Sequence, residues 1–203
     1  EWAGARPPLV GKVGAVTWGN GTTGIVGTPT SVNSMVGSNN QDRVGNRGVA
    51  VLSSKHYVIR NDSWEDKSVT PSRFGAVTWC NGSTGSSGIV GTGNSVVGTG
   101  QTDDLTRSGI TPLTNGHYVV TSITWKNGTK ANAGAVMWLN GTGPTTGEPS
   151  ADNSIVGLVA NEFVGREGVV ALTNGNYVMT SKRWTGSRGS VKRWEGSGGT
   201  TGT

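Results

Sequence analysis

Histidine, the residue most often used in acid–base and metal chemistry, occurs only twice in this sequence. His56 and His117 are 61 residues apart, and Asn176 stands at the matching place of a third, similar segment. Residues at one position of successive repeats lie far apart in a repeat protein, so we expect neither a shared metal site nor an acid–base pair. No catalytic motif surrounds them. The chain is therefore predicted not to be an enzyme and to hold no metal or cofactor.

Acidic side chains form a second periodic series, which contains Asp42, Asp103 and Glu162. Each comes two residues before the Val or Leu that precedes an apolar strand. A carboxylate at such a position can accept hydrogen bonds from sugar hydroxyls, one site per repeat. It can equally accept hydrogen bonds from backbone N–H groups of the turn, as Asp commonly does. The structural role is favoured, and ligand binding stays an alternative.

Tryptophan recurs in two series. Trp18, Trp79 and Trp138 end apolar strands and are expected to pack between repeats. The second series follows the tyrosine-containing segments and adjoins polar loops: Trp64, Trp125 and Trp184. A ring at a loop offers an apolar face to a sugar or to a partner side chain, and aromatic residues are enriched among binding anchors. Packing within the repeats is the alternative for this second series.

A glycine pattern and a basic cluster suggest other ligands, both only weakly. Gly19, Gly21 and Gly24 match a dinucleotide-binding pattern, but no helical periodicity follows them, so nucleotide binding is not expected. Most of the net charge of +5 comes from five basic residues near the C-terminal end: Lys182, Arg183, Arg188, Lys192 and Arg193. Two tryptophans lie close to them in the sequence. Such a cluster suits nucleic acid or anionic glycans. Its small size favours a solvated face, and a nucleic-acid partner is not expected.

The composition indicates which elements must position these residues. The chain has 203 residues, of which 35 are glycine, and only 33% are hydrophobic. A glycine in a helix interior costs about 1 kcal/mol relative to alanine, so a helix-rich protein is not expected from this composition. Eight tryptophans argue against disorder. No apolar run reaches the roughly 20 residues of a membrane span, and we expect a mature or excised soluble segment without a signal peptide.

Four short strings recur with common offsets of 61 and 59 residues. They include Gly75-Ala-Val-Thr-Trp79, Asn94-Ser-Val-Val-Gly98 and His117-Tyr-Val-Val120, each with counterparts in the other repeats. Shared offsets among independent strings indicate an internal repeat. We predict one repeat domain over 1–203, with units at about 14–74, 75–133 and 134–188 and a partial unit with a glycine-rich tail at 189–203.

Each unit is predicted to contain four short β-strands. The strings are rich in Val, Ile, Thr, Tyr and Trp and are separated by Gly and Asn. Thr114-Asn-Gly116 and Thr173-Asn-Gly175 predict hairpins with type I′ turns, because Asn-Gly tolerates positive φ. Ser53-Ser-Lys55 stands at the same place in an earlier repeat, where a different turn is expected. The order is an apolar strand, the tyrosine strand, the Gly-Ala-Val strand and a short Asn-Ser strand.

Four-stranded units at this spacing are typical of β-propeller blades, which places this chain in the all-β class with a propeller-like repeat architecture. Another all-β repeat, a sandwich or a solenoid is the alternative. About three units are fewer than a closed propeller usually needs. Either the chain is part of a longer array, or copies associate as a homo-oligomer that completes a ring or an array, or the units stack in another way.

The strings Thr173-Asn-Gly-Asn-Tyr-Val178, Gly75-Ala-Val-Thr-Trp79 and Asn20-Gly-Thr-Thr-Gly24 resemble short repeats found in large secreted bacterial haemagglutinin-like adhesins. The resemblance covers about residues 11 to 182. In layout these repeats are similar to FG-GAP repeats of integrin-type propellers. The closely spaced Asp residues of the FG-GAP calcium loop are missing from the polar loops here, so calcium is not carried over.

This resemblance implies a secreted or cell-surface protein without enzymatic activity. The leading hypothesis is an adhesin-like or lectin-like domain that binds glycans or cell-surface components weakly once per repeat and gains strength by multivalency. The alternative is a structural spacer or self-assembling module whose repeats only stack. An enzyme is the third and least favoured hypothesis.

Overall fold

The chain folds into four small β-sheets and almost no helix. The structure is a computed structural model that describes residues 11–70, 72–100, 103, 105–106, 108–184 and 189–198. The all-β fold predicted from the composition is confirmed. No helix in this part of the chain is long and apolar enough to cross a membrane.

The two central sheets each have four antiparallel strands. One contains, in spatial order, β3 (Val49–Val51), β4 (Tyr57–Asp66), β5 (Arg73–Cys80) and β7 (Val96–Val97). The next contains β8 (Ile110–Pro112), β9 (Tyr118–Ser122), β10 (Ala135–Leu139) and β11 (Ser154–Val156), which neighbour one another in this order. The predicted order of apolar, tyrosine, Gly-Ala-Val and Asn-Ser strands is confirmed in both.

The two outer sheets have three strands each. The first contains β1 (Ala15–Thr17), β2 (Ser34–Val36) and β6 (Gly88–Ile89), and the last contains β12 (Val169–Ala171), β13 (Tyr177–Ser181) and β14 (Ser190–Trp194). Strand β6 belongs to the loop between β5 and β7 and pairs with β2 in parallel. Each of the predicted units at 14–74, 75–133 and 134–188 contains strands of more than one sheet, because a sheet begins at an apolar strand such as β3.

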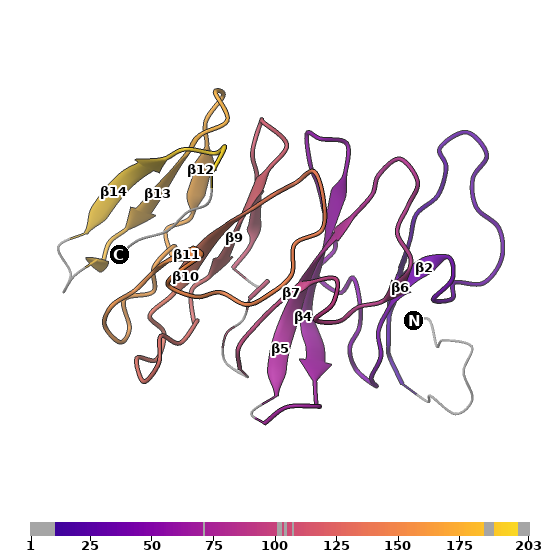
Figure 1. Cartoon of the computed structure of the whole chain (residues 1–203), viewed down its shortest axis with the longest axis horizontal. Helices are drawn as coiled ribbons and strands as arrows, with labels where there is room; N and C mark the ends of the chain where they lie inside the picture. The colour runs from indigo at the N-terminus through magenta and orange to yellow at the C-terminus, as the bar shows by residue number, and fades with distance from the viewer. Residues whose placement is uncertain are drawn as a thin grey trace.

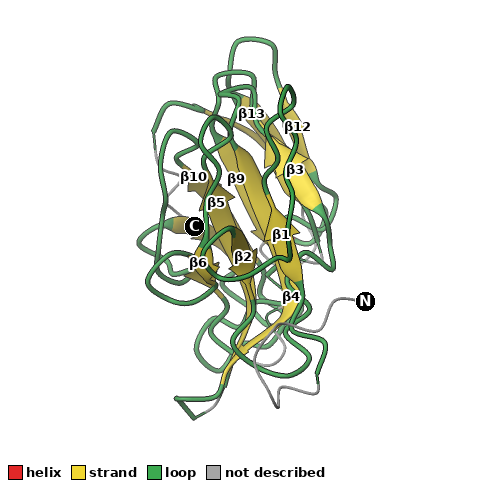
Figure 2. Cartoon of the chain, turned by 90° about the vertical axis from the view of Figure 1, so that its right-hand side faces the viewer, coloured by secondary structure: helices red, strands yellow, loops and turns green. Residues whose placement is uncertain are grey.

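The sheets stand side by side in an open row (Figure 1), with the first sheet at one end and the last at the other. Seen from the end of the first sheet, the strands of successive sheets lie behind one another (Figure 2). The described residues form no closed ring. The repeats therefore stack face to face like propeller blades, without the closure of a propeller.

Alternating side chains give every inner sheet two buried faces. Tyr57 and Ile59 on β4 pack toward the first sheet, whereas Val58 between them packs toward the third. Along β9, Tyr118 faces the second sheet and Val119 the fourth. This two-sided burial explains why the strands consist of Val, Ile and aromatic residues instead of an apolar–polar alternation.

The second, third and fourth sheets each begin with a hairpin, and these three hairpins have the same turn: β3–β4, β8–β9 and β12–β13. Leu52 N–H donates to His56 O and accepts from Lys55 N–H through its carbonyl, and Leu113 and Leu172 make the matching pairs. Such a three-residue loop has one left-handed residue at its third position. Gly116 and Gly175 have φ of 93° and 87°, and Lys55 has φ of 67°. The predicted type I′ turn is wrong, because Asn115 and Asn174 do not have positive φ, and the turn at Ser53-Ser-Lys55 does not differ.

Candidate functional site

The first tryptophan series joins each sheet to the next. The indole N–H of Trp18 donates to Gly82 O at 2.9 Å, that of Trp79 to Gly141 O at 3.0 Å and that of Trp138 to Gly196 O at 2.8 Å. Each acceptor lies in the following repeat. The predicted packing of this series between repeats is confirmed. We call the contact between one sheet and the next a junction.

The same glycines also bind the hairpin of their own sheet. Gly82 N–H donates to His56 Nδ1 at 3.2 Å, and Gly141 N–H donates to His117 Nδ1 at 3.2 Å. In the last sheet, Asn176 Oδ1 replaces the imidazole and accepts from the corresponding amide. The two histidines thus belong to separate sheets and hold the acceptor glycine in place as polar residues after a turn.

Aromatic contacts accompany these hydrogen bonds. The rings of His56 and Trp79 lie 4.7 Å apart at 56°, and His117 and Trp138 repeat this arrangement at 54°. His56 therefore holds Gly82, whose carbonyl accepts the indole N–H of Trp18. The ring of His56 also packs on Trp79, which makes the hydrogen bond of the next junction. Successive junctions are linked by direct contact.

The hairpin turns add a second set of donors. Ser54 Oγ donates to Gly141 O at 3.0 Å, and Asn115 Nδ2 donates to Gly196 O at 2.8 Å. Both positions are the middle of the three-residue loop. Asn115 of the first Asn-Gly turn is therefore used as a donor across a junction and not for its tolerance of positive φ.

No side chain fits at the acceptor glycines. A Cβ at Gly141 would lie 1.7 Å from Gly116 O, and one at Gly82 would lie 1.8 Å from Lys55 O. These glycines were not identified from the sequence. Their signal is an Asn-Gly pair after the tryptophan strand, seen at 81–82 and 140–141.

The acidic series is buried in the turns that follow the Asn-Ser strands β2, β7 and β11. Asp42, Asp103 and Glu162 are at most 3% exposed, and their carboxylates accept hydrogen bonds from their own chain. Asp42 Oδ2 accepts from the N–H groups of Ser38 and Asn39, each at 2.8 Å. Glu162 Oε2 accepts in the same way from Leu158 and Val159, at 2.5 and 3.1 Å. The structure places these side chains where their structural role requires, facing away from solvent.

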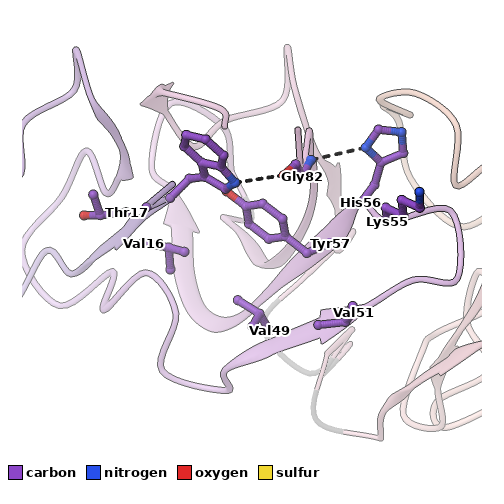
Figure 3. Close-up of a pocket in the computed structure, with 10 residues that line it drawn as sticks. Val16, Thr17, Val49, Val51, Lys55, His56, Tyr57 and Gly82 are labelled. Atoms are coloured by element: carbon purple, nitrogen blue, oxygen red, sulfur yellow. Dashed lines mark hydrogen bonds between the residues drawn. The ribbon is translucent and has the colours of Figure 1, made fainter. Parts of the chain in front are cut away.

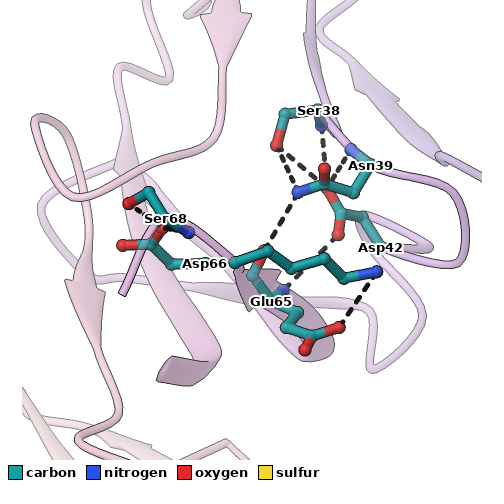
Figure 4. A network of polar contacts seen from close by, with 7 residues as sticks. Ser38, Asn39, Asp42, Glu65, Asp66 and Ser68 are labelled. Carbon is teal, nitrogen blue, oxygen red and sulfur yellow. Dashed lines mark hydrogen bonds and ion pairs between the residues drawn. The ribbon is translucent and has the colours of Figure 1, made fainter. Parts of the chain in front are cut away.

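Asp42 also reaches the next sheet. Its Oδ1 accepts from Glu65 N–H on β4 at 3.4 Å, while Asn39 Nδ2 donates to Glu65 O at 3.0 Å (Figure 4). Burial raises the pKa of Asp42, and the hydrogen bonds from Asn39, Ser38 and Glu65 oppose this rise. Burial likewise raises the pKa of Asp103 against its hydrogen bonds from Thr99. The buried carboxylates of Asp42 and Asp103 are thus compensated by hydrogen-bond donors of the chain.

The second tryptophan series lies inside the protein. Trp64 is 3% exposed and donates its indole N–H to Val90 O at 3.1 Å. Trp125 is 5% exposed and packs with Ala135 and Val156, and Trp184 is half-buried against the last junction. In this fold, Trp64 and Trp125 present no ring face to solvent, and the series packs within and between repeats.

The basic cluster is spread over the last sheet and its approach. Lys182, Arg183, Lys192 and Arg193 are exposed, and Arg188 lies outside the described residues. The Lys192 ammonium sits 4.2 Å from the centre of the Trp194 ring, and the Arg183 guanidinium 5.6 Å from that of Phe163. These cation–π contacts occupy two of the basic groups.

Two open grooves lie beside the first junction in the part of the protein that the structure describes. One, of about 330 Å³, lies between β1 and the β3–β4 hairpin (Figure 3), and the other, of about 250 Å³, lies between Trp18 and the loop before β6. In the described part of the chain, no three His, Cys, Asp or Glu side chains are grouped so that they could hold a metal ion. The recurrent polar chemistry of this protein is concentrated at the junctions.

Stacked sheets joined by repeated contacts define a modular all-β repeat protein. In sequence, residues 2–46, 51–107, 112–166 and 171–203 match a family described as a repeat of unknown function (DUF5650), and the chain belongs to this family. The second and third matches end shortly after a buried acidic residue. The first match corresponds to the later part of a repeat and the last to the earlier part. No curated protein and no solved structure matches the chain.

Proposed function

We propose that this chain is part of an extended structural array, a spacer in which each repeat binds its neighbours. The observation that carries the proposal is the tryptophan-to-glycine hydrogen bond, which occurs at all three junctions between the four sheets. Asp42, whose carboxylate accepts from Glu65 N–H, adds a further link at the first junction. Side chains that a ligand-binding repeat would expose are used to join repeats. The proposed role involves no catalysis.

An open array has a testable shape. A compact chain of this length has a radius of gyration of about 17 Å. Small-angle scattering at low concentration should give a larger value, because four sheets in a row are longer than they are wide. A radius of gyration at or below the compact value would contradict the array, since the sheets would then have closed on one another.

The junction itself is tested by Trp79→Phe. This change removes the indole donor to Gly141 O, and we expect it to lower the free energy of unfolding by about 1 kcal/mol more than the matched control. The control is Trp194→Phe, because the buried indole N–H of Trp194 has no hydrogen-bond partner in the described structure. Chemical denaturation of both variants measures the difference. Equal losses would show that the hydrogen bond does not stabilise the junction.

A second function, multivalent adhesion to glycans or cell-surface components, is favoured by the groove of about 250 Å³. Trp18, Ile25 and Val32 line it together with polar groups of Asn33 and Thr84. A sugar can pack its apolar face on an aromatic ring while polar groups beside the ring form hydrogen bonds with its hydroxyls. This function includes a secreted or cell-surface location, in agreement with the resemblance to haemagglutinin-like adhesin repeats.

Adhesion is tested on a glycan array with the double variant Ile25→Ser and Val32→Ser. Both side chains are at least half exposed, so the fold should persist while binding is lost. Val191→Ser, an equally exposed position on the last sheet, is the matched control and should bind like the unchanged chain. Binding that survives the double variant would remove this groove as the site.

A further inference from the structure

The first sheet has an open edge where the inner sheets have a strand. Strands β5 and β10 each pair with a tyrosine strand on one edge and an Asn-Ser strand on the other. Strand β1 stands at the same place of its repeat and pairs with β2. Among the described residues, no strand pairs with its other edge. The two positions that an apolar strand and a tyrosine strand occupy elsewhere are thus open at β1.

The side chains of β1 are also more exposed than those at the same positions of β5 and β10. Val16 is partly exposed, whereas Val77 and Val136, which occupy the same position, are 1% and 0% exposed. Ala15 is likewise partly exposed where Ala76 is fully buried. These side chains are apolar like those of the covered strands, but no described residue covers them to the same extent.

The opposite wall of the groove shows the same difference. Val49 and Val51 point from β3 toward the first sheet and are 49% and 71% exposed. The counterparts of Val49 at the next junctions are packed: Ile110 lies against the core between the second and third sheets, and Val169 against the core between the third and fourth. The groove of about 330 Å³ between β1 and β3 (Figure 3) is therefore apolar on both walls.

The next junction shows which element fills this space. Between the second and third sheets, Leu52 and Val58 of the β3–β4 hairpin pack in the core beside Val77 and Trp79. Between the third and fourth sheets, Val119 of β9 and Leu113 before it do the same. In both cases the filling element is a hairpin made of an apolar strand, a three-residue turn and a tyrosine strand.

We propose that the groove between β1 and β3 is a docking site for a β-hairpin of this repeat type, supplied by another repeat unit. The inference rests on the proposed array and continues the stacked interface already present between the first two sheets. The pairing of β9 with β10, in which Tyr118 is opposite Leu139 and Val119 opposite Trp138, sets the register. The docked hairpin should place its tyrosine opposite Gly19 and the next valine opposite Trp18.

A peptide with the sequence of residues 108–124, which contains β8 and β9, tests the proposal. Added to the isotope-labelled chain, it should shift amide resonances at Ala15–Trp18 and Val49–Val51 and leave those of the last sheet unchanged. A peptide with Tyr118→Ser should bind at least tenfold more weakly, since this tyrosine is 1% exposed where β9 pairs with β10. Shifts at other sheets only, or none at millimolar peptide, would overturn the docking site.

A matched pair of chain variants locates the site independently. Val51→Asp places a charge on the groove wall and should weaken peptide binding at least tenfold. Val170→Asp changes a valine that is also more than half exposed, on the first strand of the last sheet, and should leave the affinity within twofold. If the chain associates with itself and the peptide does not displace it, another face carries the contact and the proposal fails. Loss of stability in Trp79→Phe without peptide binding would retain the array and remove only the docking site.

Discussion

Lys55 has a backbone conformation that the other two hairpins give to glycine. Its φ is 67°, and Gly116 and Gly175 stand at the same place of the turn. A side chain in the left-handed region costs about 1–2 kcal/mol. Glycine removes this cost, but part of the stabilisation is lost because glycine raises the conformational entropy of the unfolded chain. Lys55→Gly should therefore raise the free energy of unfolding by about 0.5–1 kcal/mol.

Lys55→Ala is the matched control for this change. Alanine keeps the Cβ and hence the strain, so its stability should stay within about 0.5 kcal/mol of the unchanged chain. Thermal and chemical denaturation of both variants give the comparison. A glycine variant no more stable than the alanine variant would show that the turn relaxes around Lys55 without cost.

The thiol of Cys80 titrates outside its usual range. Burial raises its pKa from 9.0 to about 11, against hydrogen bonds with Tyr57 and Ser86. Between these values the unfolded chain loses the thiol proton and the folded chain keeps it. The stabilisation is thus complete below pH 9 and is lost as the pH rises toward 11, by on the order of 2–3 kcal/mol.

Cys80→Ala isolates this effect from other alkaline titrations. The variant should show a shallower fall of unfolding free energy between pH 9 and 10, before the buried tyrosines of β4 and β9, whose pKa values burial also raises, contribute. The buried thiol should also react with a thiol reagent only on unfolding. Identical pH slopes for the two chains would contradict the raised pKa.

At the scale of residues, types and spacing predicted which side chains recur in the repeats, but not whether each one points into the protein or toward solvent. Trp79 and Trp64 are both tryptophans at the end of a strand, and the sequence distinguished them only by the loop that follows. Trp64 is buried because the loop before β7 folds back over it and Val90 accepts its N–H. Asp42 turns inward because its own turn offers two free amides. Both outcomes depend on loop paths that strand patterns do not specify.

At the scale of an element, the acceptor loop after the tryptophan strand decides whether a junction forms. Gly141→Ala places a methyl group against the carbonyl of Gly116, and neither is the end of a flexible side chain. The loop must move, which separates Trp79 from its acceptor. We expect a loss of several kcal/mol, at the upper end of what single substitutions cost.

Gly143→Ala is the control in the same loop. No atom lies within 4 Å of a Cβ at Gly143, so this change should alter the free energy of unfolding by less than about 0.5 kcal/mol. Denaturation curves of the two variants under one set of conditions provide the test. Similar small losses would mean that the loop adapts and that the close approach is not required.

The strand order within a sheet was predictable, whereas the turn and the links between sheets were not. Order follows from the recurrence of strings such as Gly75-Ala-Val-Thr-Trp79, because consecutive short strands usually pair with their neighbours. The Asn-Gly pair at 115–116 is compatible with two hairpin turns, and local preference alone selects the wrong one. Tertiary contact selects the other, since Asn115 can then reach Gly196 O.

At the scale of the molecule, the sequence indicated repeats but not whether they close. Stacking is determined between neighbours, by pairs such as Trp138 and Gly196. Closure depends on the small rotation from each sheet to the next, summed over the row. That rotation comes from side-chain volumes at every junction, and no single string of the sequence encodes it. The four sheets accordingly form an open row that could extend by adding a unit at an unoccupied edge.

A row of this kind should unfold in parts, because each sheet contacts only its neighbours. Met179→Ala empties a buried position between the third and fourth sheets and should cost about 2–5 kcal/mol locally. Hydrogen exchange of β12–β14 should accelerate, while amides of β4 and β5 keep their protection. Met137→Ala, between the second and third sheets, should instead expose the strands on both its sides. Equal acceleration in every sheet on Met179→Ala would show that the row unfolds as one cooperative unit and that its junctions transmit stability from end to end.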